Sequence, residues 1–218
     1  MRILQKFWQF VGITLLALGA SQLQAQANEG YTTLQNPLPT ESGKKVEVIE
    51  FFWYGCPHCN DFDPYLEDWV KKQGDKIAFK RIPANFRESF VPQQKTYYAL
   101  EAMGKLEQYH SKIFAAIHKE RQKLDTEAQL TDFLVKNGID KAKFQEAFNS
   151  FSVQTKARRA SGLQGDYRID GVPTIVINGR YITSPSKMGE VMGRVPEPAL
   201  FQATLKLMSQ LVDKSAAK

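Results

Sequence analysis

A strand-to-helix junction holds both cysteines of this 218-residue chain, and it limits the possible folds more than any other feature. Residues 45–54, KVEVIEFFWY, are rich in β-branched and aromatic side chains and largely apolar on both faces, which is typical of a central buried strand. Pro57 follows Cys56 at the first helical position, which proline favours. Apolar residues then recur at helical spacing up to about residue 72. The sequence therefore predicts a buried strand, a short loop with Cys56, and a helix with Cys59 in its first turn.

Four interpretations of Cys56 and Cys59 compete: a structural disulfide, half of a metal site, two unreactive core thiols, or a redox centre. A disulfide across two residues closes a very short loop, and short loops stabilise least. Structural zinc needs four ligands, and the only histidines are His58, His110 and His118. The last two are eight residues apart on one predicted helix, about 12 Å along its axis, too far to share a metal. The close spacing at a strand-to-helix junction argues against idle thiols and favours the redox centre.

The expected chemistry of the two thiols differs. Cys56 faces the unpaired N–H groups and the positive end of the helix dipole, both of which favour a thiolate. His58, when protonated, adds a nearby positive charge. Cys59 lies one turn into the helix, where we expect it to be more buried and less reactive. Stabilising the thiolate stabilises the reduced form and makes the disulfide an oxidant, so the motif favours a donor of disulfides.

The N-terminus predicts export. Residues 1–27 have the layout of a secretory signal peptide: positive charges at Arg2 and Lys6, a short apolar core at 11–20, and a small-residue cleavage site ending at Ala27. An uncleaved anchor or a buried helix is the alternative, although a membrane span needs about 20 apolar residues. Cleavage would leave 191 residues in a compartment where disulfides persist.

Three further positions near the motif are candidate site residues. Glu50 shares a strand face with apolar neighbours, so we expect it to be buried beneath Cys59, with a raised pKa, and able to move protons for that thiol. The alternative is a glutamate at a bulge or strand edge that reaches solvent. Lys80 is a candidate partner of Glu50, or else an ordinary solvated lysine. Pro173, in the segment GVPT, is either trans in a plain loop or cis in a tight turn.

The rest of the chain predicts an α/β fold with a helical insertion. A second strand at 76–84 completes a βαβ half, and a hairpin turned at Asn178-Gly179 followed by a helix forms a ββα half. The expected divisions are 28–90, 91–151 and 152–218. The expected helices after the second strand cover 92–103, 105–120, 126–137, 140–150, 152–166 and 197–213, and the hairpin covers 171–185. Thr126 with Gln129 forms a capping box, and Asp140 is a helix N-cap candidate.

Composition narrows the possible partners. The chain is 43% hydrophobic and 24% charged, which is ordinary for a globular protein. The net charge is +6, of which Arg2 and Lys6 supply two, leaving +4 after cleavage. Basic residues are mixed with acidic ones, and the densest cluster, 156–159, would steer an anionic partner only weakly. We therefore expect no nucleic-acid partner. We also expect no metal, no cofactor and a monomeric protein.

The motif EFFWYGCPHC, the all-helical block, and GVPTIVINGRY, which begins 115 residues after Cys56, together resemble the DsbA family of periplasmic thiol:disulfide oxidoreductases. The resemblance covers about residues 30–213. It implies a thioredoxin fold with an inserted helical domain. It also implies that a substrate thiolate attacks Cys56 and that Cys59 is the resolving thiol.

The resemblance further implies a cis bond before Pro173, with Gly171, Val172 and Pro173 binding the substrate peptide, and a buried charged pair at Glu50 and Lys80. Expected partners are newly exported proteins with cysteines and a membrane reoxidase of the DsbB type, linked to quinone. Alternatives are a disulfide isomerase or reductase of the same fold, or a peptide-binding holdase. Only the short segment 28–45 precedes the first central strand, which argues against an isomerase with a dimerisation domain.

Overall fold

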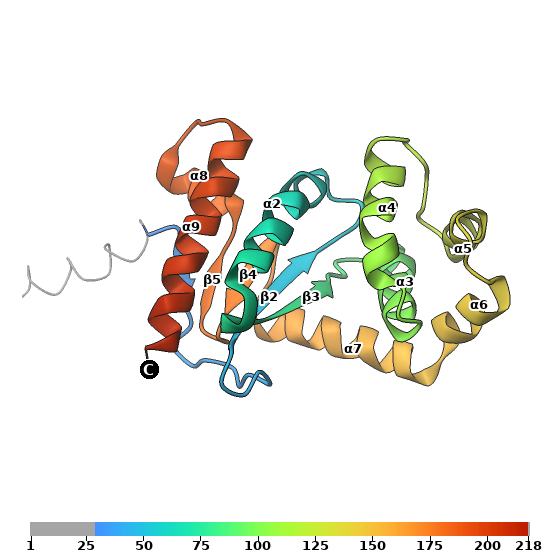
Figure 1. Ribbon diagram of the computed structural model, residues 1–218, viewed down its shortest axis with the longest axis horizontal. Coiled ribbons are helices and arrows are strands. Elements are labelled where there is room, and N and C mark those ends of the chain that lie inside the picture. The colour runs from blue at the N-terminus through green and yellow to red at the C-terminus, as the bar shows by residue number, and fades with distance from the viewer. Residues whose placement is uncertain (1–28, 218) are drawn as a thin grey trace, which may run out of the picture.

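The computed structural model describes residues 29–217, and a five-stranded sheet lies at its centre (Figure 1). The strand order is β1-β5-β4-β2-β3. Only the β2–β3 pair is parallel; the other neighbours run antiparallel. The strands are β1 (Tyr31–Thr33), β2 (Val46–Phe52), β3 (Ile77–Pro83), β4 (Thr174–Ile177) and β5 (Tyr181–Thr183). Every residue of β2 is buried, as expected of a central strand.

Helices pack on both faces of the sheet. Val48 and Ile175 belong to an apolar cluster with residues of α2 (Pro57–Gln73) and α9 (Glu197–Ala216). Phe51 and Val176, on the opposite face, belong to a second cluster with α7 (Phe151–Asp166) and the helical block. Because adjacent strand residues point to opposite faces, the apolar residues of β2 contribute to both clusters.

The helical block lies between β3 and α7 in the chain and to one side of the sheet in space (Figure 1). It contains the 3₁₀ turn η2 (Glu88–Phe90), α3 (Val91–Ala102), α4 (Leu106–His118), α5 (Glu127–Lys136) and α6 (Lys141–Asn149). The capping box at Thr126 and the N-cap at Asp140 are confirmed. The division of the chain into 28–90, 91–151 and 152–218 stays a prediction.

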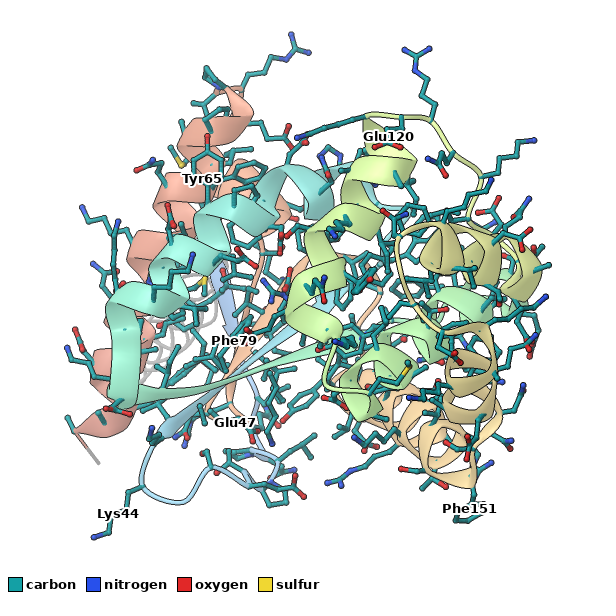
Figure 2. The ribbon with its side chains drawn as sticks, turned by 45° about the vertical axis from the view of Figure 1, so that its right-hand side comes forward. Lys44, Glu47, Tyr65, Phe79, Glu120 and Phe151 are labelled. Atoms are coloured by element: carbon teal, nitrogen blue, oxygen red, sulfur yellow. The ribbon has the colours of Figure 1, made fainter. Side chains whose placement is uncertain are left out.

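The first residue of α7, Phe151, points out to solvent (Figure 2) and is 79% exposed.

The predicted hairpin is confirmed. Asn178 and Gly179 both have positive φ, 51° and 62°, as the tight turn between β4 and β5 requires. One helix was not predicted: α8 (Pro185–Met192) follows the hairpin directly, with Ser184 as its N-cap. A short 3₁₀ turn, η1 (Gly74–Lys76), also joins α2 to β3.

The predicted signal peptide, 1–27, lies outside the described residues. Among residues 29–217, no helix combines the length and the apolar character needed to cross a membrane.

Candidate active site

The two cysteines lie at the junction between β2 and α2. Cys56 is the N-cap of α2, Pro57 is the first helical residue, and the Sγ of Cys56 accepts a hydrogen bond from the backbone N–H of Cys59 at 3.4 Å. Both cysteines are free thiols in the structure. Cys56 retains 7% exposure and Cys59 none, so an incoming sulfur has access to Cys56 only.

The surroundings separate the pKa values of the two thiols. The pKa of Cys56 is lowered to about 7, first by a hydrogen bond from the Cys59 side chain and further by the backbone N–H of Cys59 and the charge of His58. Burial raises the pKa of Cys59 well above its usual value, and the neighbouring Cys56 adds to the rise. At neutral pH the pair therefore holds one accessible, partly ionised thiol above one buried, protonated thiol.

His58 projects from the first turn of α2 toward α9. Its Nδ1 lies 2.5 Å from Oε1 of Glu197, the first residue of α9. This hydrogen bond is the largest cause of a raised pKa at His58. The imidazole is therefore held in its charged form to higher pH than an isolated histidine.

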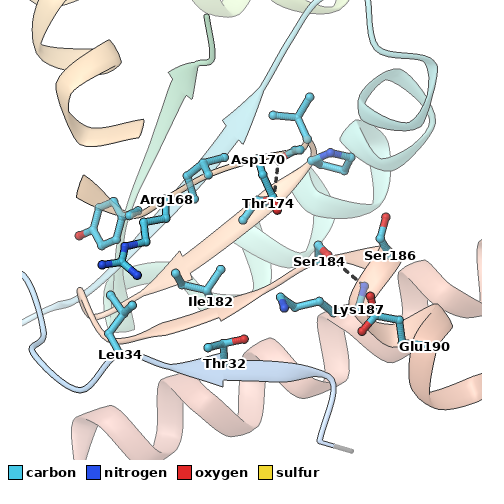
Figure 3. Close-up of a pocket in the computed structure, with 15 residues that line it drawn as sticks. Thr32, Leu34, Arg168, Asp170, Thr174, Ile182, Ser184, Ser186, Lys187 and Glu190 are labelled. Carbon is cyan, nitrogen blue, oxygen red and sulfur yellow. Dashed lines mark hydrogen bonds between the residues drawn. The ribbon is translucent and has the colours of Figure 1, made fainter. Parts of the chain in front are cut away.

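The loop before β4 closes over Cys56 from the other side. The peptide bond between Val172 and Pro173 is cis, as the resemblance to the DsbA family implied. The thiol of Cys56 donates a hydrogen bond to the carbonyl oxygen of Val172 at 3.4 Å. The hydroxyl of Thr174 donates to the carbonyl oxygen of Gly171 at 2.7 Å and fixes the loop (Figure 3).

A pocket of about 420 Å³ lies beside this loop, bounded by β1, β5 and the start of α8 (Figure 3). Its lining is charged on several sides: Arg168, Asp170, Lys187 and Glu190 all border it. The pocket therefore offers a polar surface next to the main chain of Val172.

Glu50 is buried beneath the cysteines, as predicted, with 1% exposure. Burial raises its pKa to about 7, against the lowering effect of Arg81. The Nε of Arg81 donates a hydrogen bond to Oε2 of Glu50 at 2.9 Å. The pKa of this carboxyl group thus lies near neutral pH, and its charge contributes to the raised pKa of Cys59.

The predicted pairing of Lys80 with Glu50 is wrong. In the parallel register, Glu50 lies opposite Arg81, whereas Lys80 lies opposite Ile49 and points to the other face of the sheet. There, the Nζ of Lys80 donates to Oε2 of Glu47 at 2.7 Å, and the Lys80 side chain is 39% exposed. A shift of one residue along β3 therefore replaces the expected lysine by an arginine.

The comparisons with known proteins agree with this geometry. Residues 47–203 match the model of the DSBA-like thioredoxin domain. A thiol:disulfide interchange protein DsbA of Burkholderia cepacia is 46% identical over 187 residues, which cover 82% of this chain and 88% of that protein. The chain belongs to the DsbA family. A DsbA of Pseudomonas aeruginosa is 36% identical over 204 residues, covering 94% of this chain and 92% of that protein.

Solved structures of the DsbA family have the same fold. The crystal structure of Pseudomonas aeruginosa DsbA superposes with a TM-score of 0.78 at 37% identity and covers 86% of this chain and 93% of that one. The oxidoreductase NmDsbA1 from Neisseria meningitidis gives a TM-score of 0.70 at 26% identity, covering 87% and 94%. The thioredoxin fold with a helical block is therefore confirmed, and the chain is a thiol:disulfide oxidoreductase.

Beneath the motif of this DsbA-family chain lies a buried polar network that the sequence analysis missed. One Nη of Arg81 donates to Oδ1 of Asp63 at 2.8 Å, and the same oxygen lies 3.3 Å from Nε2 of His110. Burial opposes ionisation of Asp63, but hydrogen bonding to His110 and the charge of Arg81 hold its pKa below the usual value. Burial lowers the pKa of His110, so its ring is neutral near pH 7.

Two histidines of α4 bind the loop that leads into Cys56. The hydroxyl of Tyr54 lies 2.9 Å from Nδ1 of His110, and Nε2 of His118 donates to the backbone oxygen of Tyr54 at 2.8 Å. We infer that His110 carries its proton on Nε2, which faces Asp63, and that Nδ1 accepts a hydrogen bond from the Tyr54 hydroxyl. These two hydrogen bonds connect the helical block to Tyr54, two positions before Cys56.

No group of three or more metal-binding side chains is found within residues 29–217.

Proposed function

We propose that the protein oxidises pairs of thiols in exported proteins by giving up a disulfide between Cys56 and Cys59. The observation that carries this proposal is the contrast within the pair: Cys56 is accessible with a pKa lowered to about 7, and Cys59 is buried with a raised pKa. A thiol with a lowered pKa is a good leaving group and is stable when reduced, so the disulfide favours transfer to the substrate.

The transfer takes two exchanges. A substrate thiolate attacks Sγ of Cys56, the bond to Cys59 breaks, and Cys59 leaves with the electron pair and takes up a proton. A second substrate thiolate then attacks the substrate sulfur of this mixed disulfide and releases Cys56 as a thiolate. The substrate gains one disulfide and loses two electrons, which the protein now holds in its reduced pair, with Cys56 as a thiolate and Cys59 as a thiol. Glu50, with a pKa of about 7, supplies or accepts the proton at Cys59.

The loop formed by Gly171, Val172 and Pro173 is proposed to bind the substrate backbone. The carbonyl oxygen of Val172 already accepts the proton of Cys56, so it lies at the reacting sulfur. A peptide in an extended conformation pairs with such a backbone by strand addition, which is independent of its side chains. This mode fits an enzyme that acts on many different proteins.

The compartment and the reoxidation step complete the proposal. We infer a periplasmic protein that begins at Asn28 after cleavage behind Ala27, because residues 1–27 have the layout of a signal peptide. After each turnover the reduced pair needs an acceptor for two electrons. A membrane reoxidase of the DsbB type, which passes electrons to quinone, is the proposed acceptor.

Two serine variants test this proposal. Cys56→Ser is expected to abolish oxidation of a reduced dithiol peptide, because the accessible sulfur is lost. Cys59→Ser, which removes the second sulfur and retains the accessible one, is expected to accumulate mixed disulfides between Cys56 and substrates. Oxidation by Cys56→Ser, or a Cys59→Ser protein that captures no substrate, would contradict the assigned roles.

A further inference from the structure

We propose that Glu197 is a positioning residue for the redox reaction: it holds His58 against α9 as a charged imidazolium, and the charge of that ring stabilises the thiolate of Cys56. This inference rests on the proposed function of the cysteine pair. It assigns a role to the start of α9, which lies 139 residues from His58 in the chain and contributes no sulfur to the reaction.

The contact is built by helix packing. Phe201 of α9 packs on Phe62 and Tyr65 of α2, with ring centroids 5.2 and 5.4 Å apart. This packing places the first turn of α9 beside the first turn of α2. Glu197 then reaches Nδ1 of His58 at 2.5 Å. The position of the carboxylate is therefore set by a buried aromatic cluster and not by the two surface side chains alone.

Glu197 lies at the positively polarised end of a helix. It is the first residue of α9, whose N-cap, Pro196, makes no side-chain cap. The unpaired N–H groups at a helix start carry a partial positive charge that stabilises a carboxylate. Glu197 also borders a groove of about 540 Å³ between α2, α4 and α9, so solvent reaches it.

The groups around His58 determine the direction in which its pKa is shifted. Hydrogen bonding to Glu197 is the largest cause that raises the pKa of His58, and the charges of Glu197, Cys56 and Asp61 add to it. Burial of the ring acts in the opposite direction and lowers its pKa. Lys119 of α4 borders the groove beside Glu197. The charge on His58 in turn lowers the pKa of Cys56. Glu197 therefore acts on the sulfur through the ring.

This arrangement has a pH signature. Below the ordinary histidine pKa of about 6.5, His58 is protonated with or without Glu197, so the carboxylate adds no charge to the ring. Between that pH and the raised pKa of His58, only the protein with Glu197 keeps the imidazolium. The effect of Glu197 on the reduction potential is therefore expected to appear above about pH 6.5 and to disappear below about pH 5.5.

The test compares Glu197→Gln with Asp61→Asn, which also removes an acid near His58 but no hydrogen bond to it. Glu197→Gln is expected to lower the pKa of His58, read by NMR, and to lower the equilibrium constant for oxidising glutathione at pH 7 about two- to fivefold, the scale of an exposed ion pair. Asp61→Asn is expected to have a smaller effect on both. In a His58→Ala background, Glu197→Gln is expected to leave the equilibrium constant unchanged.

The results that would refute the role of Glu197 differ from the result that would refute the proposed function. An unchanged or raised equilibrium constant in Glu197→Gln, or an equal loss in the His58→Ala background, would overturn the role of Glu197 while the parent protein still oxidises dithiols. A parent protein that is a poor oxidant would instead refute the proposed function. A loss that persists unchanged at pH 5.5 would show that Glu197 acts through packing, and would also overturn the inference.

Discussion

Arg81 lies opposite Glu50 across the parallel strands β2 and β3, and its guanidinium binds both Glu50 and Asp63, at 2.9 and 2.8 Å. One buried guanidinium thus donates hydrogen bonds to two buried carboxyl groups beneath the cysteines. Burial raises the pKa of Glu50 to about 7, and the charge of Asp63 adds to the rise against the lowering effect of Arg81, so Glu50 retains its proton until the pH approaches that value. The redox pair is therefore placed over a proton donor that titrates near neutral pH.

Replacing Arg81 is expected to destabilise the fold strongly. Arg81→Met leaves two buried acids without their cation, and the loss of one partner from a buried ion pair costs about 3–5 kcal/mol. The control is Lys45→Met, where an exposed pair with Asp75 contributes far less to stability. Urea unfolding of the reduced proteins measures both. Equal losses from the two variants would contradict the assignment of Arg81 as the buried partner.

The titration of Glu50 predicts a pH dependence of stability. Its pKa is about 7 in the folded protein and 4.5 when unperturbed, so between these values the folded protein alone holds the proton. The contribution to stability is thus full below about pH 4.5 and is lost as pH rises to 7. At about 1.4 kcal/mol per pKa unit, the loss is about 3 kcal/mol.

Glu50→Gln removes this titrating group and nearly preserves its shape. The variant is expected to lose less stability than the parent between pH 4.5 and 7, in urea unfolding at each pH. The difference between the two curves isolates Glu50 from other titrating groups. Parallel curves would show that the buried carboxyl group does not titrate in that range.

The hydroxyl of Tyr54 is expected to contribute to stability through His110. Tyr54→Phe leaves Nδ1 of a buried histidine unpaired, which costs about 1–3 kcal/mol. Tyr98→Phe is the control, because no hydrogen bond of the Tyr98 hydroxyl is found within residues 29–217, and we expect a change within about 0.5 kcal/mol. Thermal unfolding measures both variants. A Tyr54→Phe protein as stable as the control would remove this link between α4 and the active-site loop.

Ionisation of Cys56 is directly observable. In the reduced protein, thiolate absorbance at 240 nm is expected to rise with a midpoint near pH 7, with an amplitude of one thiolate, since burial holds the pKa of Cys59 far higher. His58→Ala is expected to move the midpoint upward and to lower the reduction potential. A midpoint near the usual cysteine value of about 8.5 would contradict the stabilised thiolate.

Much of this site was predictable from local sequence, because its determinants are local. Pro57 after Cys56 marks the helix start, and the Asn178-Gly179 pair marks the hairpin; each acts within a few residues. The cis bond at Pro173 required the family resemblance, because local sequence leaves both isomers open. The unpredicted helix α8 does carry a local signal, since Ser184 and Pro185 are typical of a helix start.

The network below the cysteines was not predictable from local sequence. Whether Lys80 or Arg81 meets Glu50 depends on the strand register, which the sequence of β3 alone does not specify. The contacts of Tyr54 with His110 and of His58 with Glu197 span 56 and 139 residues. An acid at Asp63, on the buried face of α2, was the one available signal, because a buried acid requires a partner.

The reduction potential of the Cys56–Cys59 pair, measured by equilibration with glutathione at pH 7, tests the central claim most directly. A stabilised thiolate at Cys56 predicts a potential well above that of thioredoxin, about −270 mV, so that the oxidised protein converts glutathione to its disulfide. A potential at or below the thioredoxin value would identify a reductant and contradict the account of Cys56 as the thiol that makes this protein an oxidant.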